Sequence, residues 1–133
     1  MPGTTDLEKL ISAMQPRLHP GSYVFCSLNE LNNEHSRHAI MVFKEAEGVT
    51  LILPREAADQ LGLHYSFVAA WITLQVHSAL EAVGLTAAFS TALATNGISA
   101  NVVAGFYHDH IFVAQEDAER AVQVLESLAN ERP

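Results

Sequence analysis

Cysteine, basic side chains and long apolar runs are all scarce in this sequence of 133 residues. A single cysteine, Cys26, excludes an internal disulfide framework, so the fold must rest on a hydrophobic core. A chain of this length buries roughly two-thirds of its unfolded surface, which is enough for such a core. Cys26 ends the apolar run Tyr23-Val24-Phe25 and has no basic neighbour, which favours a small buried side chain over a catalytic thiol.

Lysine and arginine total 7 against 15 acidic residues, which gives a formal net charge of −8. The basic residues are scattered and form no cluster along the chain. Because like charges repel, this balance argues against binding to nucleic acid or to anionic lipid. We therefore expect neither nucleic acid nor a membrane among the partners.

No apolar run is long enough to span a bilayer. The first six residues, Met1–Asp6, also lack the cationic and apolar stretches of a secretory signal peptide. The expected location is therefore the cytoplasm.

Apolar periodicity and turn residues predict alternating helices and strands. In the first half we expect a helix over 6–15, strands over 23–28, 39–43 and 49–53, and a short helix over 54–62. In the second half we expect a strand over 71–76, a helix over 85–95, strands over 98–106 and 110–113, and a helix over 116–128. Residues 29–37 are expected to form a polar loop, and residues 63–70 show no strong pattern.

The two halves look related at an offset of 60 residues. At this offset residues 52–58 align with residues 112–118, and each segment is predicted to be the end of a strand followed directly by an acidic helix start. Only Glu and Ala match identically there, so the similarity rests on pattern. We expect two domains, residues 1–65 and residues 66–133.

From Trp71 onward the predicted order is β-α-β-β-α. The run from Ile72 to Leu85, the run from Leu93 to Val102 and the hairpin that contains Asp109 resemble the ACT domain. They are especially similar to bacterial ACT-containing proteins of unknown function that resemble tandem-ACT amino-acid sensors.

The resemblance is strongest over residues 71–128 and holds at family level over 7–62. It implies an α+β, ferredoxin-like fold with a C-terminal ACT βαββα unit, a second ACT-like N-terminal half, and antiparallel sheets with helices packed on one face. It also implies a regulatory module that binds a small molecule, with an amino acid as the expected ligand. Most ACT regulators carry a catalytic domain and this sequence shows none, so what it regulates stays open.

ACT domains pair side by side and bind ligands at the seam, through the loop after the first strand and the following strand of a partner. By resemblance these are residues 78–85 and 98–103. The expected ligand-binding residues are Ser78, Leu80, Val83, Gly84, Leu85, Thr86, Ile98 and Asn101. Gly84 permits a positive φ or a close ligand approach, and the first amides of the following helix can receive a carboxylate. Gly84 is also explained by a simple strand-to-helix turn.

A second cluster, His108-Asp109-His110, leaves another possibility open. Two histidines two residues apart with a carboxylate can ligate a metal, yet the same residues suit a polar hairpin turn. Further ligands could come from His35, His38, His64 and His77. The sequence contains no nucleophile motif, phosphate loop or dinucleotide fingerprint. We therefore expect no catalysis, no cofactor and no metal.

Two alternative functions remain. One is a structural or oligomerisation protein whose ligand site is degenerate, and the less favoured one is a small metal-dependent enzyme that uses His108 and His110. ACT-like sheets present an edge that is stable only when it is covered or paired. We therefore expect a homodimer or a higher even oligomer.

Overall fold

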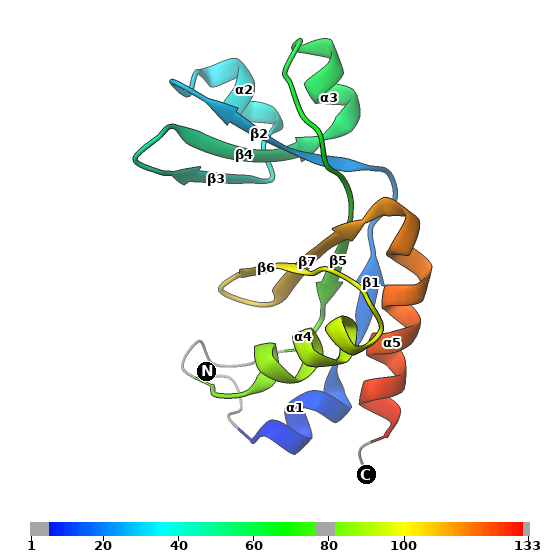
Figure 1. Cartoon of the computed structure of the whole chain (residues 1–133). Helices are drawn as coiled ribbons and strands as arrows, with labels where there is room; N and C mark the ends of the chain where they lie inside the picture. The colour runs from blue at the N-terminus through cyan, green and yellow to red at the C-terminus, as the bar shows by residue number, and fades with distance from the viewer. Residues whose placement is uncertain (1–5, 77–81, 132–133) are drawn as a thin grey trace. The chain divides into compact units, whose positions relative to one another are not determined.

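The computed structural model describes residues 6–76 and 82–131 of the chain and has an α+β structure (Figure 1). Its elements are α1 (Leu7–Ala13), β1 (Pro16–Leu18), β2 (Tyr23–Leu28), α2 (Asn33–His38), β3 (Met41–Lys44), β4 (Val49–Pro54), α3 (Arg55–Gln60), β5 (Val68–Leu74), α4 (Leu85–Thr95), β6 (Asn101–Ala104), β7 (Asp109–Ala114), the 3-10 turn η1 (Gln115–Asp117) and α5 (Ala118–Asn130). None of these described helices is long and apolar enough to cross a membrane.

The described residues divide into two compact units, one of which is inserted into the other. The inserted unit is Pro20–Ala69. The host unit contains the described residues on both sides of it, up to His19 and from Ala70 onward. The chain therefore leaves the host unit once and returns to it once.

The inserted unit runs β2-α2-β3-β4-α3 and ends on the first two residues of β5. Its strand order is β3-β4-β2-β5, in which Val68 and Ala69 of β5 pair with Val24 and Tyr23 of β2. The apolar face of this sheet packs against α3. The core consists of Val24, Cys26, Leu51, Leu53, Ala57 and Ala58.

The host unit has the strand order β1-β5-β7-β6. The segment β5-α4-β6-β7-α5 supplies three of these strands, and the fourth, β1, comes from the N-terminal segment. Residues Pro16, Arg17 and Leu18 pair with Leu74, Thr73 and Ile72 of β5. Both units thus have the ferredoxin-like order fourth-first-third-second, and the host unit obtains its fourth strand from the beginning of the chain.

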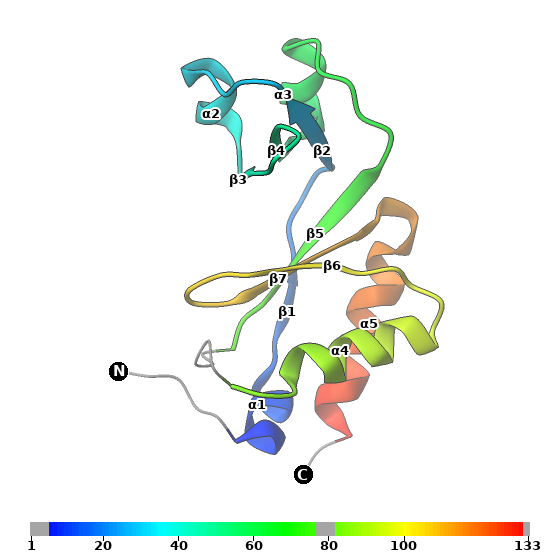
Figure 2. The ribbon, with the colours of Figure 1, turned by 60° about the vertical axis from the view of Figure 1, so that its left-hand side comes forward.

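The core of the host unit takes side chains from all three of its described α-helices, and Figure 2 shows α4 and α5 on one face of the host strands. The largest helical contributions have at most 1% exposure: Leu10, Ile11, Phe89, Leu93 and Leu125. They pack with residues of β5 and β7: Ala70, Ile72, Leu74, Ile111 and Val113. The N-terminal helix is therefore an integral part of this core.

Local sequence explains how the N-terminal segment switches from helix to strand. The Asp6 carboxylate accepts a hydrogen bond from the Lys9 amide (3.3 Å), which caps the start of α1. Pro16 has no amide hydrogen to continue the helix, and it begins β1. The pairing of β1 with β5 is then extended by a bond from the His19 amide to the Trp71 carbonyl (2.9 Å).

Much of the predicted secondary structure is confirmed. The helix over 85–95 is α4 with the same bounds, and the strands expected at 23–28, 49–53 and 110–113 are β2, β4 and β7 to within one residue. The predicted α+β, ferredoxin-like fold with two such halves is also confirmed.

Three predictions were wrong in part. The expected loop over 29–37 contains α2, whose start is capped by the Asn32 side chain through the His35 amide (2.8 Å). The strand expected over 98–106 is only β6, because the Ile98 amide still bonds to the Leu93 carbonyl (3.0 Å) at the end of α4. The strand expected over 71–76 begins three residues earlier, at Val68.

The sequence halves and the compact units use different parts of the chain. The domains expected at 1–65 and 66–133 follow the order of elements along the sequence. In the structure, residues 6–19 pack with residues from 70 onward. A strand of three residues cannot be stable alone, and β5 supplies the edge with which β1 pairs.

Truncation of Leu10 tests this arrangement. Leu10→Ala removes a fully buried side chain from the host core, so we expect a loss of about 3 kcal/mol in the free energy of unfolding. Urea denaturation followed by fluorescence of the single tryptophan, Trp71, measures it within the same unit. Leu31→Ala, at a position 37% exposed in the inserted unit, is the control and should cost less than about 1 kcal/mol. Equal effects of the two variants would contradict the packing of α1 in the host core.

Candidate functional site

The loop before α4 ends on a glycine in a left-handed conformation. Gly84 has φ +99° and occupies the N-cap position of α4. No side chain caps this helix start, and the Gly84 carbonyl accepts the bond from Ala88 (2.9 Å). The first amides of a helix lack partners within the helix and carry partial positive charge. The start of α4 therefore has the backbone geometry expected of a site for a carboxylate.

The side chains of the expected ligand-binding residues differ in their exposure to solvent. Val83 is 83% exposed and Thr86 is also exposed, so both side chains are accessible. Leu85 and Ile98 are buried in the host core at 4% and 2% exposure, so only their backbone atoms could meet a ligand. Asn101 is exposed, and its side-chain amide donates to the Phe112 carbonyl (3.3 Å).

Two of the expected ligand-binding residues, Ser78 and Leu80, lie outside the described residues. The described part of the expected site is therefore the start of α4 with Val83, Gly84 and Thr86.

The remaining expected contact, Asn101, lies at the other end of α4. This helix has 11 residues and follows Gly84, whereas Asn101 comes after its C-terminal end. A helix of that length spans about 16 Å at 1.5 Å per residue. A single ligand could then meet both Gly84 and Asn101 only if the strand came from a second copy.

Leu7 of α1 occupies space beside the loop. A Cβ atom at Gly84 would lie 3.1 Å from Leu7 Cδ2 and 3.5 Å from Leu7 Cδ1. One side of the glycine is thus closed by the N-terminal helix, and a ligand would have to approach from another side. Two surface grooves of about 380 Å³ each lie elsewhere in the host unit, one between α4 and α5 and the other beside Pro16 and α5.

A polar cluster that the sequence did not reveal lies on the face of the host sheet opposite the helical core. Trp71 and Thr73 of β5 and His110 of β7 alternate with core residues, and His19 follows β1. Thr73 Oγ1 lies 2.7 Å from His19 Nε2 and 3.1 Å from His110 Nδ1. The Trp71 indole donates to His110 Nδ1 (3.1 Å), and the His19 ring stacks on Trp71 at a centroid distance of 3.6 Å.

Burial shapes the ionisation of this cluster. Desolvation lowers the pKa of His110, and nearby His108 lowers it further while Asp109 opposes both. Desolvation also lowers the pKa of His19, with smaller contributions from Arg17 and His110. Burial raises the pKa of Asp109 against the opposing effect of His110 and His108. Both cluster histidines are therefore neutral at neutral pH.

The alternative of a metal site at His108-Asp109-His110 finds no support in the geometry. Among residues 6–76 and 82–131, no three His, Cys, Asp or Glu side chains come together as metal ligands. His110 Nδ1 is instead used by Trp71 and Thr73. His77, one of the suggested further ligands, lies outside the described residues.

Two family models with the description "ACT domain" match the chain, one over residues 2–70 and the other over residues 66–127. The chain belongs to the ACT domain family. No curated protein matches it.

Solved structures support the tandem ACT assignment. A protein of unknown function from Vibrio cholerae, described as a possible transport protein, is 52% identical over 92% of this chain and 95% of its own, with a TM-score of 0.84. A protein from Agrobacterium tumefaciens is 19% identical over 87% of this chain and 89% of its own (TM-score 0.72).

A further solved structure shares the fold at lower identity. The regulatory subunit of aspartate kinase from Thermus thermophilus, in its ligand-free form, is 9% identical over 87% of this chain and 98% of its own (TM-score 0.61). At that identity the similarity concerns the fold alone.

Substitutions at Gly84 and Gly97 test the left-handed backbone before and after α4. Gly84→Val places a β-branched side chain at φ +99° against Leu7, and we expect it to cost about 2 kcal/mol of unfolding free energy. Gly97→Ala, at φ +73° with nothing within 4 Å of the added Cβ, should cost about 1 kcal/mol. Urea denaturation measures both, and a Gly84→Val variant as stable as the parent would contradict the left-handed conformation.

Proposed function

We propose that this ACT protein is a regulatory module that binds an amino acid at the start of α4 and catalyses no reaction. The observation that carries the proposal is the presence of two ACT units in a chain whose fold covers 98% of the regulatory subunit of an aspartate kinase. Membership of the ACT family supports the regulatory class of function, and the amides at the start of α4 supply the groups that would bind a carboxylate.

An amino acid matches the described part of the site. Its carboxylate would accept hydrogen bonds from the first amides of α4, where the helix dipole favours a negative charge. Gly84 has no side chain to block the backbone, and the exposed Val83 and Thr86 would contact the rest of the ligand. Asn101 of a second copy would supply an amide to the polar end of the ligand.

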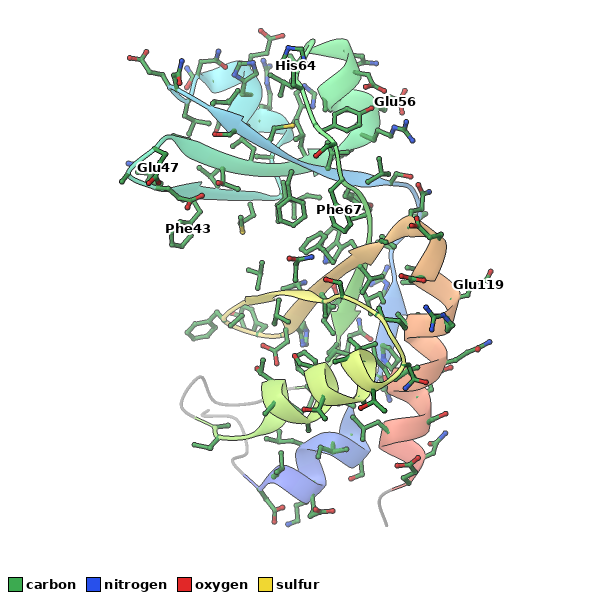
Figure 3. The ribbon with its side chains drawn as sticks, in the orientation of Figure 1. Phe43, Glu47, Glu56, His64, Phe67 and Glu119 are labelled. Carbon is green, nitrogen blue, oxygen red and sulfur yellow. The ribbon has the colours of Figure 1, made fainter. Side chains whose placement is uncertain are left out.

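The site proposal therefore requires an oligomer. β6 lies at the edge of the host sheet, and the aromatic side chains that follow it, Phe106 and Tyr107, are 75% and 65% exposed. β3 is the edge of the inserted unit, and Phe43 on it is 62% exposed (Figure 3). Apolar groups beside an open strand edge favour pairing with another chain. We propose a homodimer or higher even oligomer, located in the cytoplasm, with neither nucleic acid nor a membrane as a partner.

A structural or oligomerisation role with a degenerate site is the second candidate. The contact between Leu7 and the Cβ position of Gly84 favours it, because a bulky side chain already closes one side of the loop. The two candidates differ in whether the amides at the start of α4 are occupied by a ligand.

A thermal-shift screen of the common amino acids tests ligand binding. A ligand at 100 times its dissociation constant should raise the free energy of unfolding by about 2.7 kcal/mol. If none of the amino acids raises the melting temperature, the degenerate-site candidate replaces binding.

A charge at the helix start locates the site. Thr86→Glu places a carboxylate where the helix dipole favours it, so the free protein should gain about 0.5 kcal/mol of stability. The same charge repels the ligand carboxylate, and we expect affinity to fall at least about fivefold by titration calorimetry. Thr91→Glu, at an exposed position later in α4, is the control and should bind as the parent does. If Thr86→Glu also binds like the parent, the site lies elsewhere.

Light scattering tests the oligomer. Paired sheet edges should give twice the monomer mass of 14.5 kDa, or a higher even multiple, at micromolar concentration. A monomer mass that persists at high micromolar concentration would contradict both the oligomer and the shared ligand site.

A further inference from the structure

The polar cluster of His19, Trp71, Thr73 and His110 lies where the chain connects the two units. His19 is the last residue of the host unit before Pro20, and Trp71 is the second residue after the chain returns at Ala70. His19 is bound to β5 in three ways: its amide donates to the Trp71 carbonyl, its ring stacks on the indole, and Nε2 meets the Thr73 hydroxyl. These contacts fasten the end of the N-terminal segment to β5.

The hydrogen bonds define which ring nitrogens carry protons. An indole N–H can only donate, so His110 Nδ1 must accept from Trp71, and the neutral ring keeps its proton on Nε2. The Thr73 hydroxyl has one proton to give and two histidine neighbours. A proton added to His110 Nδ1 would point at the indole N–H and break that bond.

When both His19 and His110 are protonated, no rearrangement of the hydrogen bonds satisfies every donor in the cluster. With both rings charged, Thr73 Oγ1 could accept from each of them, but its own proton would then have no acceptor in the cluster. Thr73 is 5% exposed, so an unpaired donor there is costly. The charged groups around the two rings are Arg17 beside His19, and His108 and Asp109 beside His110. Only Asp109 among them favours a charged ring.

We propose that the His19–Thr73–His110 network is a proton-sensitive clasp, which holds β1 and His19 on β5 at neutral pH and increases the open fraction of this pairing on acidification. Release takes up one proton at His110 and one at His19. It breaks the Trp71–His110 and Thr73–His19 hydrogen bonds and exposes the edge of β5 that β1 covers. The clasp is independent of the proposed ligand site.

Hydrogen exchange of the unmodified protein tests the clasp without any variant. A histidine whose pKa returns to about 6.5 on opening increases the open fraction by at most about tenfold between pH 7.5 and 5.5, so two such histidines increase it by at most about a hundredfold. We expect an increase between these two limits, after correction for intrinsic exchange, at the amides of Arg17 and His19, which face β5 in the antiparallel pair. Residues 49–54 of β4, in the inserted unit, are the internal reference and should change less than about threefold. An increase below about tenfold at β1, or an equal increase at β4, would overturn the proposal.

Fluorescence identifies the residues involved, since Trp71 is the single tryptophan. We expect its emission to change with a midpoint below about pH 6.5 in the parent. The change should be lost or reduced at least by half in His19→Gln and His110→Gln, which keep a polar side chain but do not titrate. His64→Gln, at an exposed position of the inserted unit (Figure 3), is the matched control and should titrate like the parent. An unchanged titration in both cluster variants would assign the transition to other groups and overturn the clasp.

Discussion

The pairing of β1 with β5 is the contact on which the host unit depends. Without it the host sheet would have three strands, and Leu10 and Ile11 of α1 would be removed from the core they share with α4 and α5. β1 has three residues and a single partner strand, so backbone pairing alone holds it weakly. Its position is secured on both sides, by burial of α1 on the helical face and by the stacked His19 ring on the other. The His19 side chain therefore has a structural role in holding β1 on β5, in addition to being a group that can take up a proton.

The parts of the fold that local chemistry determines could be predicted from the sequence. α4 has an apolar face at helical spacing, and a glycine stands at each end of it, so its bounds follow from Gly84 and Gly97. β5 shows the limit of this approach, because Ala69 and Ala70 are both buried and give no alternation between an inner and an outer face. β1 shows another limit. Nothing in Pro16-Arg17-Leu18 indicates that its partner lies beyond an entire inserted unit.

The same distinction applies to the functional residues. Gly84 could be predicted because a glycine before a helix has a local conformational meaning, and its left-handed φ agrees with that expectation. Leu7 and the His19–Thr73–His110 cluster could not, because their neighbours come from distant segments whose register had to be known first. The sequence did draw attention to His110, but as a possible metal ligand with His108. Its actual partners are on β5, one strand away in the sheet.

The insertion also determines the order in which the two units can form during synthesis on the ribosome. The inserted unit is complete once Ala69 has left the exit tunnel, and its strands pair mostly with near neighbours. The host unit must wait for α5, although α1, which packs in the same core, is made before the whole inserted unit. Throughout that interval the apolar side of α1 has no core to join, and an unpaired apolar segment is a target for chaperones or for the same segment of a neighbouring chain. A nascent chain that exchanged the segment from α1 to His19 with a neighbour would form the same contacts across two molecules, which makes domain swapping the natural assembly error of this architecture.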